Sequence, residues 1–171
     1  MGNNWKITDT LTKVFADEVP DGQGSIRLST LHRETVSCVI AYLGAADWGR
    51  YWKVSVKAPE KIETRLRRIE LVPSAYPCHK EQDDNYLRIV RGMYPDLLRD
   101  LDTEGDGADK KYLTKEVPGQ WRSLWLDVTV DAELAGGDYA IMIETETEDG
   151  EKETLKADLH VVDASLPPQK L

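Results

Sequence analysis

One acidic stretch of the chain, residues 102–107, has side chains that could bind a hard cation. Oxygen-bearing residues alternate along it, and Gly107 stands at the sixth position, where a calcium loop turns sharply. The twelfth position should hold a bidentate glutamate, but it is Leu113, and no helical pattern flanks the segment. The missing ligand favours a mobile acidic loop over a calcium site. We therefore expect no metal site and no cofactor.

Three aromatic residues that could contact a sugar surround Gly49, namely Trp48, Tyr51 and Trp52. Aromatic rings combine a flat apolar face with a polar edge, so a loop that exposes them would form a platform for a sugar ring. The same residue types also pack into the rim of a β-sandwich core. Both interpretations stay open from the sequence, and these three residues are the candidate carbohydrate-binding set.

No catalytic group can be singled out from the sequence. A glycosidase site needs two carboxyl groups at a set separation, and the 31 acidic residues are too many to choose from. Asp127 and Asp131 would share one face of a strand, and exposed carboxylates on a solvated face are the favoured explanation for them. His32, His79 and His160 share no local motif, and no phosphate-binding loop or nucleophile elbow is present. The chain alone is therefore not expected to be catalytic.

The two cysteines, Cys38 and Cys78, do not have metal-ligand spacing. Cys38 lies in an apolar run and is expected to be a small buried hydrophobe. A disulfide bond between the two is the alternative. Reduced thiols fit the cytoplasm, where disulfides are rare.

Charge and hydropathy exclude several classes of partner. The 171 residues include 22 basic and 31 acidic side chains, for a formal net charge of -9. A nucleic-acid site or an anionic membrane surface needs a basic face, so neither partner is expected. No apolar run approaches the roughly 20 residues of a membrane-spanning helix. The first ten residues lack the apolar core of a secretory signal, and we expect a cytoplasmic protein.

Short runs rich in β-branched residues indicate an all-β fold. The strongest is Thr35–Leu43, nine apolar and small residues that predict a central strand buried on both faces for part of its length. Residues 62–72 predict a strand with a bulge near Arg67 and Arg68, although a helix over 59–71 competes. Further strands are predicted at residues 7–15, 25–30, 51–58, 86–91, 121–131, 138–147 and 151–163.

The spacing of these strands predicts their arrangement. Turns at Gly136–Gly137 and at residues 148–150 join the last three strands, and the second turn ends in the Asp-Gly pair typical of a tight hairpin. Trp121 is assigned to the core and Trp125 to an interface, which conflicts with their equal parity on one strand. Strands every 10 to 15 residues with no long helical pattern predict a two-sheet antiparallel β-sandwich, immunoglobulin-like or jelly-roll-like, of eight or nine strands.

Several motifs in the same order and spacing make the chain resemble a known family, the amino-terminal β-sandwich domain of glycoside hydrolase family 123-type proteins, also described as domain of unknown function 4091. These motifs are residues 29–42, 88–100, 94–98, 124–128 and 136–139. The resemblance implies that a barrel removing N-acetylgalactosamine or related sugars follows the sandwich. The catalytic acids of such proteins lie in that barrel, so none can be carried over to this chain.

The resulting expectation is an accessory domain over residues 1–165. Residues 166–171, which include Pro167 and Pro168, form either a linker stub toward a catalytic barrel of the same polypeptide or a frayed tail. Tyr94, Pro95, Asp96 and Leu97 are the expected contact with the barrel, and the alternative is that residues 94–98 only turn a corner inside the sandwich. Residues 95–98 are expected to form a helical turn. Two other functions remain open: a carbohydrate-binding module using Trp48–Trp52, and a stand-alone protein–protein interaction sandwich.

Overall fold

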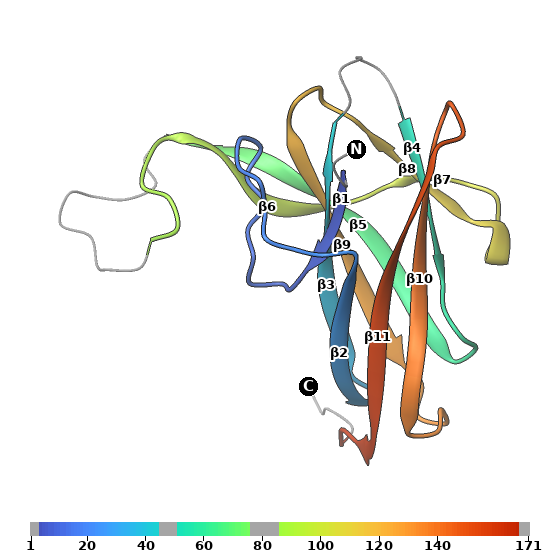
Figure 1. Ribbon diagram of the computed structural model, residues 1–171. Helices are drawn as coiled ribbons and strands as arrows, with labels where there is room; N and C mark the ends of the chain where they lie inside the picture. The colour runs from blue at the N-terminus through green and yellow to red at the C-terminus, as the bar shows by residue number, and fades with distance from the viewer. Residues whose placement is uncertain (1–3, 45–50, 76–85, 168–171) are drawn as a thin grey trace.

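The protein is a sandwich of two β-sheets (Figure 1). The computed structural model describes residues 4–44, 51–75 and 86–167. The strands are β1 (Trp5–Thr8), β2 (Ser25–His32), β3 (Thr35–Leu43), β4 (Tyr51–Lys57), β5 (Ile62–Ser74), β6 (Gly92–Asp100), β7 (Asp102–Glu104), β8 (Lys111–Lys115), β9 (Trp121–Val130), β10 (Gly137–Thr147) and β11 (Lys152–Ser165), with one 3-10 turn over Gly107–Asp109. The predicted fold class is confirmed. The described residues form eleven strands instead of eight or nine, because β7 lies in a segment expected to be a loop and β8 was not predicted.

Sheet A has the strand order β1-β3-β9-β5-β6, and sheet B has the order β2-β11-β10-β4-β8-β7. Neighbouring strands are antiparallel, except that β2 runs parallel to β11. β9 and β10 were expected to form one antiparallel unit, but they belong to different sheets. The turn at Gly136–Gly137 therefore crosses between the layers, whereas β10 and β11 form the expected hairpin across residues 148–150.

The central strand β3 has the predicted bounds, and its residues from Cys38 to Tyr42 are buried one after another. One side of β3 faces the core between the sheets, and the other side contributes Val39 and Ala41 to a second apolar cluster. Cys38 is a free thiol, and burial raises its pKa to about 12. It therefore packs as the small hydrophobe that the sequence predicts.

The core between the sheets is filled from strands of both layers. Sheet A contributes Ile40, Leu124, Leu126 and Val128, which alternate with outward residues as the pleat requires. Sheet B contributes Val54, Ile141, Ile143, Leu155, Leu159 and Val161. At one end, Trp5 stacks on Tyr42 with ring centroids 4.9 Å apart. The Tyr42 hydroxyl lies 2.7 Å from the hydroxyl of Thr114, which satisfies both polar groups inside the core.

Two predicted strands have different bounds. β1 ends at Thr8 instead of continuing to Phe15, because the Asp9 carboxylate accepts the backbone N–H groups of Leu11 and Thr12, both at 2.9 Å, and turns the chain. Residues 86–91 are not a strand. The strand begins at Gly92 and runs through residues 95–98, where a helical turn was expected.

Edge position and a bulge explain the course of β6. Sheet edges tolerate proline because its missing N–H need not join a ladder, and β6 is the terminal strand of sheet A. The register of the β5–β6 ladder shifts between Glu70 and Leu71, where Asp96 is the extra residue, so the bulge lies on β6 and not near Arg67 and Arg68 as expected. Strand, not helix, is correct for this segment.

A second apolar cluster lies on the outer face of sheet A. It contains Val14, Val39, Ala41 and Trp121, with Leu43, Ile69 and Trp125 packed against it. Trp121 and Trp125 therefore lie on the same side of β9, as their parity requires, and the assignment of Trp121 to the main core is wrong. Residues 9–20, here named the covering segment, supply Val14 to this cluster. Its Ala16 carbonyl accepts the Trp121 N–H at 3.0 Å.

No helix among the described residues is long and apolar enough to cross a bilayer.

Candidate functional site

An extended arm projects from one side of the sandwich (Figure 1). We define the arm as residues 70–75 and 86–98, which are the end of β5, the start of β6 and the segment before β6. Nine large apolar side chains are exposed among the described residues, and six of them lie on the arm: Tyr86, Leu87, Ile89, Val90, Met93 and Leu97. Leu87 is the most open of the six, at 73% exposed. Concentration of apolar groups on one projection is typical of an interaction surface.

Tyr94 holds the arm in place. Its hydroxyl has one proton to donate and lies within hydrogen-bond distance of two backbone carbonyls, that of Arg88 at 3.1 Å and that of Val90. Its ring packs edge-on against Phe15 of the covering segment, with centroids 5.6 Å apart. Of the four residues expected to contact a barrel, Tyr94 is thus partly buried, Pro95 is buried, and Asp96 and Leu97 are exposed. The structure places all four on the arm.

Arg88 ties the arm to the covering segment. Its guanidinium lies 3.9 Å from the centroid of the Phe15 ring and donates hydrogen bonds to Asp17, at 2.9 Å, and to Glu18. The hydrogen bond from Arg88 holds the pKa of the Asp17 carboxyl below its ordinary value. This tie is fully formed above the ordinary carboxyl range and is lost as the pH falls through the lowered pKa.

Removing this guanidinium is expected to loosen the covering segment. In Arg88→Ala, backbone amides of residues 10–19 should exchange with solvent about tenfold faster, because two charge-assisted hydrogen bonds and one ring contact disappear. Hydrogen exchange read by mass spectrometry measures this effect. Arg91→Ala, which changes an exposed arginine of the same arm, is the matched control and should leave exchange unchanged. Equal exchange in both variants would contradict the proposed tie.

Two hollows lie where the arm meets the covering segment. The larger has a volume of about 510 Å³ and is lined mostly by apolar and aromatic side chains, including Phe15, Val72, Tyr86 and Tyr94. The smaller has a volume of about 240 Å³ and lies over Val39, Ile69 and Trp125. The Lys13 ammonium donates a hydrogen bond to the Pro95 carbonyl at 3.3 Å, and both residues line both hollows. The surface between the arm and the covering segment is therefore concave at two places.

A partner would contact the side chains of the arm more readily than it would pair with the backbone edge of β6. β6 is the outermost strand of sheet A, but Pro95 has no N–H to donate. The Pro95 carbonyl is already bonded by Lys13, and the β5–β6 ladder is interrupted by the bulge beside Leu71. Proline and bulges are the devices that keep edge strands from pairing with other chains.

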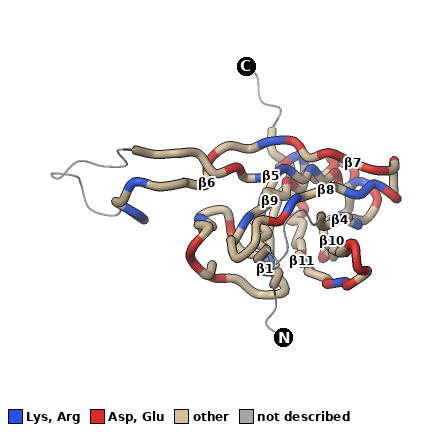
Figure 2. The backbone as a smooth tube through the Cα atoms, turned by 90° about the horizontal axis from the view of Figure 1, so that it is seen from above, with Lys and Arg blue, Asp and Glu red and all other residues tan. Residues whose placement is uncertain are grey.

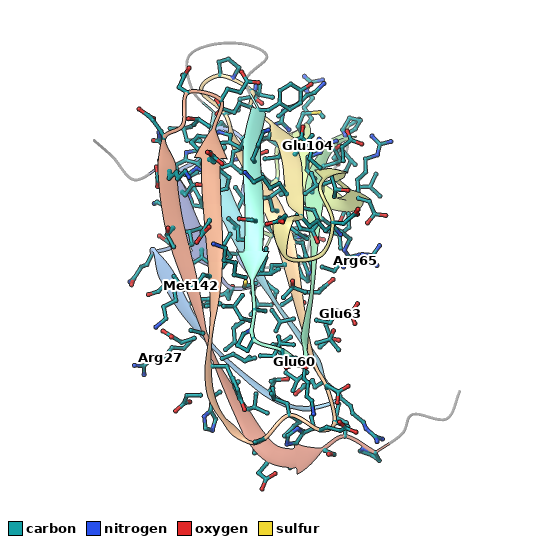
Figure 3. The ribbon with its side chains drawn as sticks, turned by 90° about the vertical axis from the view of Figure 1, so that its right-hand side faces the viewer. Arg27, Glu60, Glu63, Arg65, Glu104 and Met142 are labelled. Carbon is teal, nitrogen blue, oxygen red and sulfur yellow. The ribbon has the colours of Figure 1, made fainter. Side chains whose placement is uncertain are left out.

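The outer face of sheet B is different, because charged residues cover it. Lys57 pairs with Glu144 at 2.7 Å, and Lys111 pairs with Glu146 at 3.1 Å. Figure 3 shows Arg27, Met142 and Glu104 along this side of the molecule, and Figure 2 shows acidic and basic residues gathered around β7, β8 and β10 while the arm carries few. Exposed ion pairs of this kind are typical of a solvated face.

The two candidate acids, Asp127 on β9 and Asp131 directly after it, are both engaged in hydrogen bonds. Asp127 is 17% exposed, and its carboxylate accepts hydrogen bonds from Ser37 at 2.7 Å, from the Trp125 indole N–H at 2.6 Å and from Arg67 at 2.5 Å. Burial alone would raise the pKa of Asp127, but these hydrogen bonds outweigh it and hold the pKa below its ordinary value. Asp131 instead accepts the Glu133 N–H in a turn at 2.8 Å.

The aromatic residues near Gly49 differ in their burial. Trp52 is 5% exposed and packs edge-on against Trp5, with centroids 5.0 Å apart, so it takes the core-packing role that the sequence left open. Tyr51 is partly exposed, and the Lys115 ammonium lies 5.2 Å from the centroid of its ring. Trp48 lies outside the described residues.

The remaining candidates are dispersed. His32 lies 3.6 Å from Asp163, and His160 lies 2.7 Å from Asp138, while His79 and Cys78 lie outside the described residues. In the acidic stretch, Asp102–Glu104 forms β7, and Glu104 pairs with Lys53 at 2.8 Å. Within the described ranges, no group of three histidine, cysteine or acidic residues is arranged to hold a metal ion.

Comparison with solved structures shows that the sandwich is similar to part of a larger enzyme. A family 123 glycoside hydrolase from Clostridium perfringens, studied for glycolipid glycan hydrolysis, matches with a TM-score of 0.63 and 10% identity, over 95% of this chain and 28% of that chain. The likeness shows a shared fold. The chain thus spans little more than a quarter of that enzyme, as a domain within a larger polypeptide would. No family model and no curated protein matches the sequence.

Two further structures have lower scores. The carboxy-terminal domain of the AgI/II polypeptide BspA from Streptococcus agalactiae matches with a TM-score of 0.45 and 14% identity, over 92% of this chain and 49% of that chain. The major pilin subunit BcpA of Bacillus cereus matches with a TM-score of 0.44 and 9% identity, over 93% of this chain and 40% of that chain.

Proposed function

We propose that this chain is a non-catalytic, amino-terminal accessory domain of a glycoside hydrolase related to family 123, and that its arm docks against the catalytic barrel of the same polypeptide. The observation that carries the proposal is the concentration of exposed apolar side chains on the arm. The likeness to part of a family 123 enzyme supports it, because that enzyme continues well beyond the matched sandwich.

Burial of the arm against another domain would be favourable. Full burial of a large aliphatic side chain stabilises by about 1.5–3 kcal/mol, and Leu87, Ile89 and Val90 are each more than half exposed. The arm stands clear of the sandwich, so a neighbouring domain can reach it without displacing a strand (Figure 1). Tyr94 and Arg88 fix the arm beforehand, which lowers the entropy that docking must overcome.

The charge distribution also favours the arm as the docking surface. The described residues of the arm include two acidic side chains, Glu70 and Asp96, in a chain of net charge -9, and Figure 2 shows most of the arm without charge. Charged groups that lose water without a partner oppose association. A barrel would therefore pack on the arm at lower cost than on the charged outer face of sheet B.

The chemistry is then assigned to the barrel, which would remove N-acetylgalactosamine or a related sugar. The two acids that the sequence singles out are already engaged in the structure: the Asp127 carboxylate accepts hydrogen bonds from Ser37 and Trp125, and Asp131 accepts a backbone N–H in a turn. The purified 171-residue chain should not hydrolyse a chromogenic N-acetylgalactosaminide. Hydrolysis by this chain alone would overturn the proposal.

Thermal unfolding of the linked protein tests the docking. In the polypeptide that joins the chain to its barrel, Leu87→Asp with Val90→Asp should lower the melting temperature of the barrel by several degrees, while the isolated 171-residue chain melts as before. Val162→Asp, which places the same charge at an exposed apolar site on β11, is the control and should have no such effect.

Two outcomes would contradict docking through the arm. One is a barrel whose melting temperature is equal in the arm variant and in the Val162 control. The other is a reading frame that ends at Leu171. The second outcome would favour a stand-alone interaction domain, in which the same arm meets a separate protein.

A further inference from the structure

The smaller hollow, here named the Trp125 slot, has both apolar and polar side chains in its lining. It lies between residues 10–14 of the covering segment and residues 95–98 of the arm, and every residue that lines it belongs to the described part of the chain. Its floor comes from neighbouring strands of sheet A, with Val39 opposite Trp125 in the ladder and Ile69 opposite Leu98. We infer that this slot binds one pyranose ring of a carbohydrate, with Trp125 as the stacking surface.

The Trp125 ring is held in a fixed orientation. Its indole N–H donates to the Asp127 carboxylate at 2.6 Å, and Ser37 and Arg67 hold that carboxylate from two other strands. Because these hydrogen bonds keep the pKa of Asp127 low, the acceptor stays ionised at neutral pH. A stacking ring that is already fixed loses little side-chain entropy when a ligand arrives.

The lining of the slot combines an apolar floor with polar groups. Thr10, Thr12, Lys13 and Asp96 line it alongside the aliphatic residues and Trp125. The Lys13 ammonium donates one hydrogen bond to the Pro95 carbonyl, and its two other N–H groups can donate to a ligand. The Asp96 carboxylate is exposed and has no hydrogen-bond partner among the described residues, so it is available as an acceptor.

A sugar ring fits this combination better than a purely apolar ligand does. A pyranose has an apolar face of C–H groups and a belt of hydroxyls that both donate and accept hydrogen bonds. The face matches the Trp125 ring, and the belt matches a neighbouring ammonium and carboxylate. An apolar side chain would leave the ammonium and the carboxylate without ligand partners, and it would gain nothing from their proximity.

The size of the slot limits the ligand to a single ring. Sites for drug-sized ligands usually have volumes of roughly 300–1,000 Å³, and the slot has about 240 Å³. A ligand this small, with few polar partners, should bind with a dissociation constant on the order of millimolar. This inference does not depend on docking by the arm, because every residue that lines the slot belongs to the 171-residue chain.

Nuclear magnetic resonance of the isolated chain tests the slot. The indole N–H signal of Trp125 should shift saturably when galactose, glucose or N-acetylgalactosamine is added at millimolar concentrations, for at least one of the three sugars. The indole signals of Trp5 and Trp52, which lie in the core, serve as internal controls and should stay in place. Single Trp→Phe variants assign the signals.

Substitutions at the rim separate sugar binding from a change in folding. Asp96→Asn and Lys13→Met each change an exposed side chain, so the fold should survive, and each should weaken binding about tenfold. Tyr51→Ala removes the other partly exposed aromatic candidate and should leave the affinity unchanged.

Three results would overturn the inference. The first is the absence of a saturable shift of Trp125 with every sugar. The second is a saturable shift with p-cresol but with no sugar, which would make the slot a socket for an apolar side chain of a neighbouring domain. The third is sugar binding that survives both rim substitutions but is lost in Tyr51→Ala, which would move the site to the β4 end of the sandwich.

Discussion

Replacing Trp5 with alanine is expected to lower the free energy of unfolding by about 3–5 kcal/mol, the usual cost of removing a buried aromatic side chain. Trp5 is fully buried although it lies on a strand of only four residues near the start of the chain. Its ring stacks on Tyr42 and meets the edge of Trp52, and both of those residues are themselves buried. The alanine variant would leave a cavity between the two sheets.

Urea denaturation followed by circular dichroism measures this change. Leu11→Ala is the matched control, because Leu11 follows the same strand but is 86% exposed, and its substitution should alter the free energy of unfolding only slightly. A Trp5→Ala protein as stable as the Leu11→Ala protein would mean that β1 is not part of the cooperative core.

The parts of the fold that the sequence predicts well are those with strong local signals. Thr35–Leu43 has the predicted bounds because its β-branched run is both strand-forming and apolar on two faces. The hairpin from β10 to β11 follows from the Asp-Gly pair at its turn and from regular alternation on either side. In both cases local propensity and tertiary packing favour the same structure.

Where local patterns allow two answers, the tertiary structure decides. The apolar residues at 86–91 resemble a strand, yet they are exposed on the arm, and the strand lies at Gly92–Asp100. Only the edge position of β6 makes Pro95 acceptable there. The pairing of β9 also depends on distant segments, since its neighbours are β3 and β5 and not the adjacent β10.

The contact of residues 94–97 with a barrel stays a prediction, and these residues lie on the arm. The sequence indicated neither the exposure of the preceding apolar residues nor the pairing of Arg88 with Asp17. The signal for the Trp125 slot was present in the equal parity of Trp121 and Trp125. That parity required a second apolar face on sheet A, and the covering segment that encloses it comes from a distant part of the chain.

A methyl group added at Gly44 is expected to cost about 3 kcal/mol or more, because it would enter space occupied by backbone. The added carbon would lie 2.1 Å from the carbonyl oxygen of Val117. Neither side can easily move away, since Gly44 donates its N–H to the Gln120 carbonyl at 3.1 Å and accepts the Gly119 N–H at 3.3 Å. Backbone atoms cannot change rotamer to relieve such a clash.

The consequence of Gly44→Ala should extend to the Trp125 slot. Residues 117–120 lead directly into β9, which carries Trp121 and Trp125, so displacing them shifts the start of the strand that forms the slot floor. Gly24→Ala is the matched control, because nothing lies within 4 Å of the carbon it adds. Urea denaturation should separate the two variants clearly, and the Trp125 indole signal should move only in Gly44→Ala. Equal stability of the two proteins would mean that the close packing between β3 and the segment before β9 is not required for folding. That packing could then not be what holds the floor of the Trp125 slot rigid for a sugar.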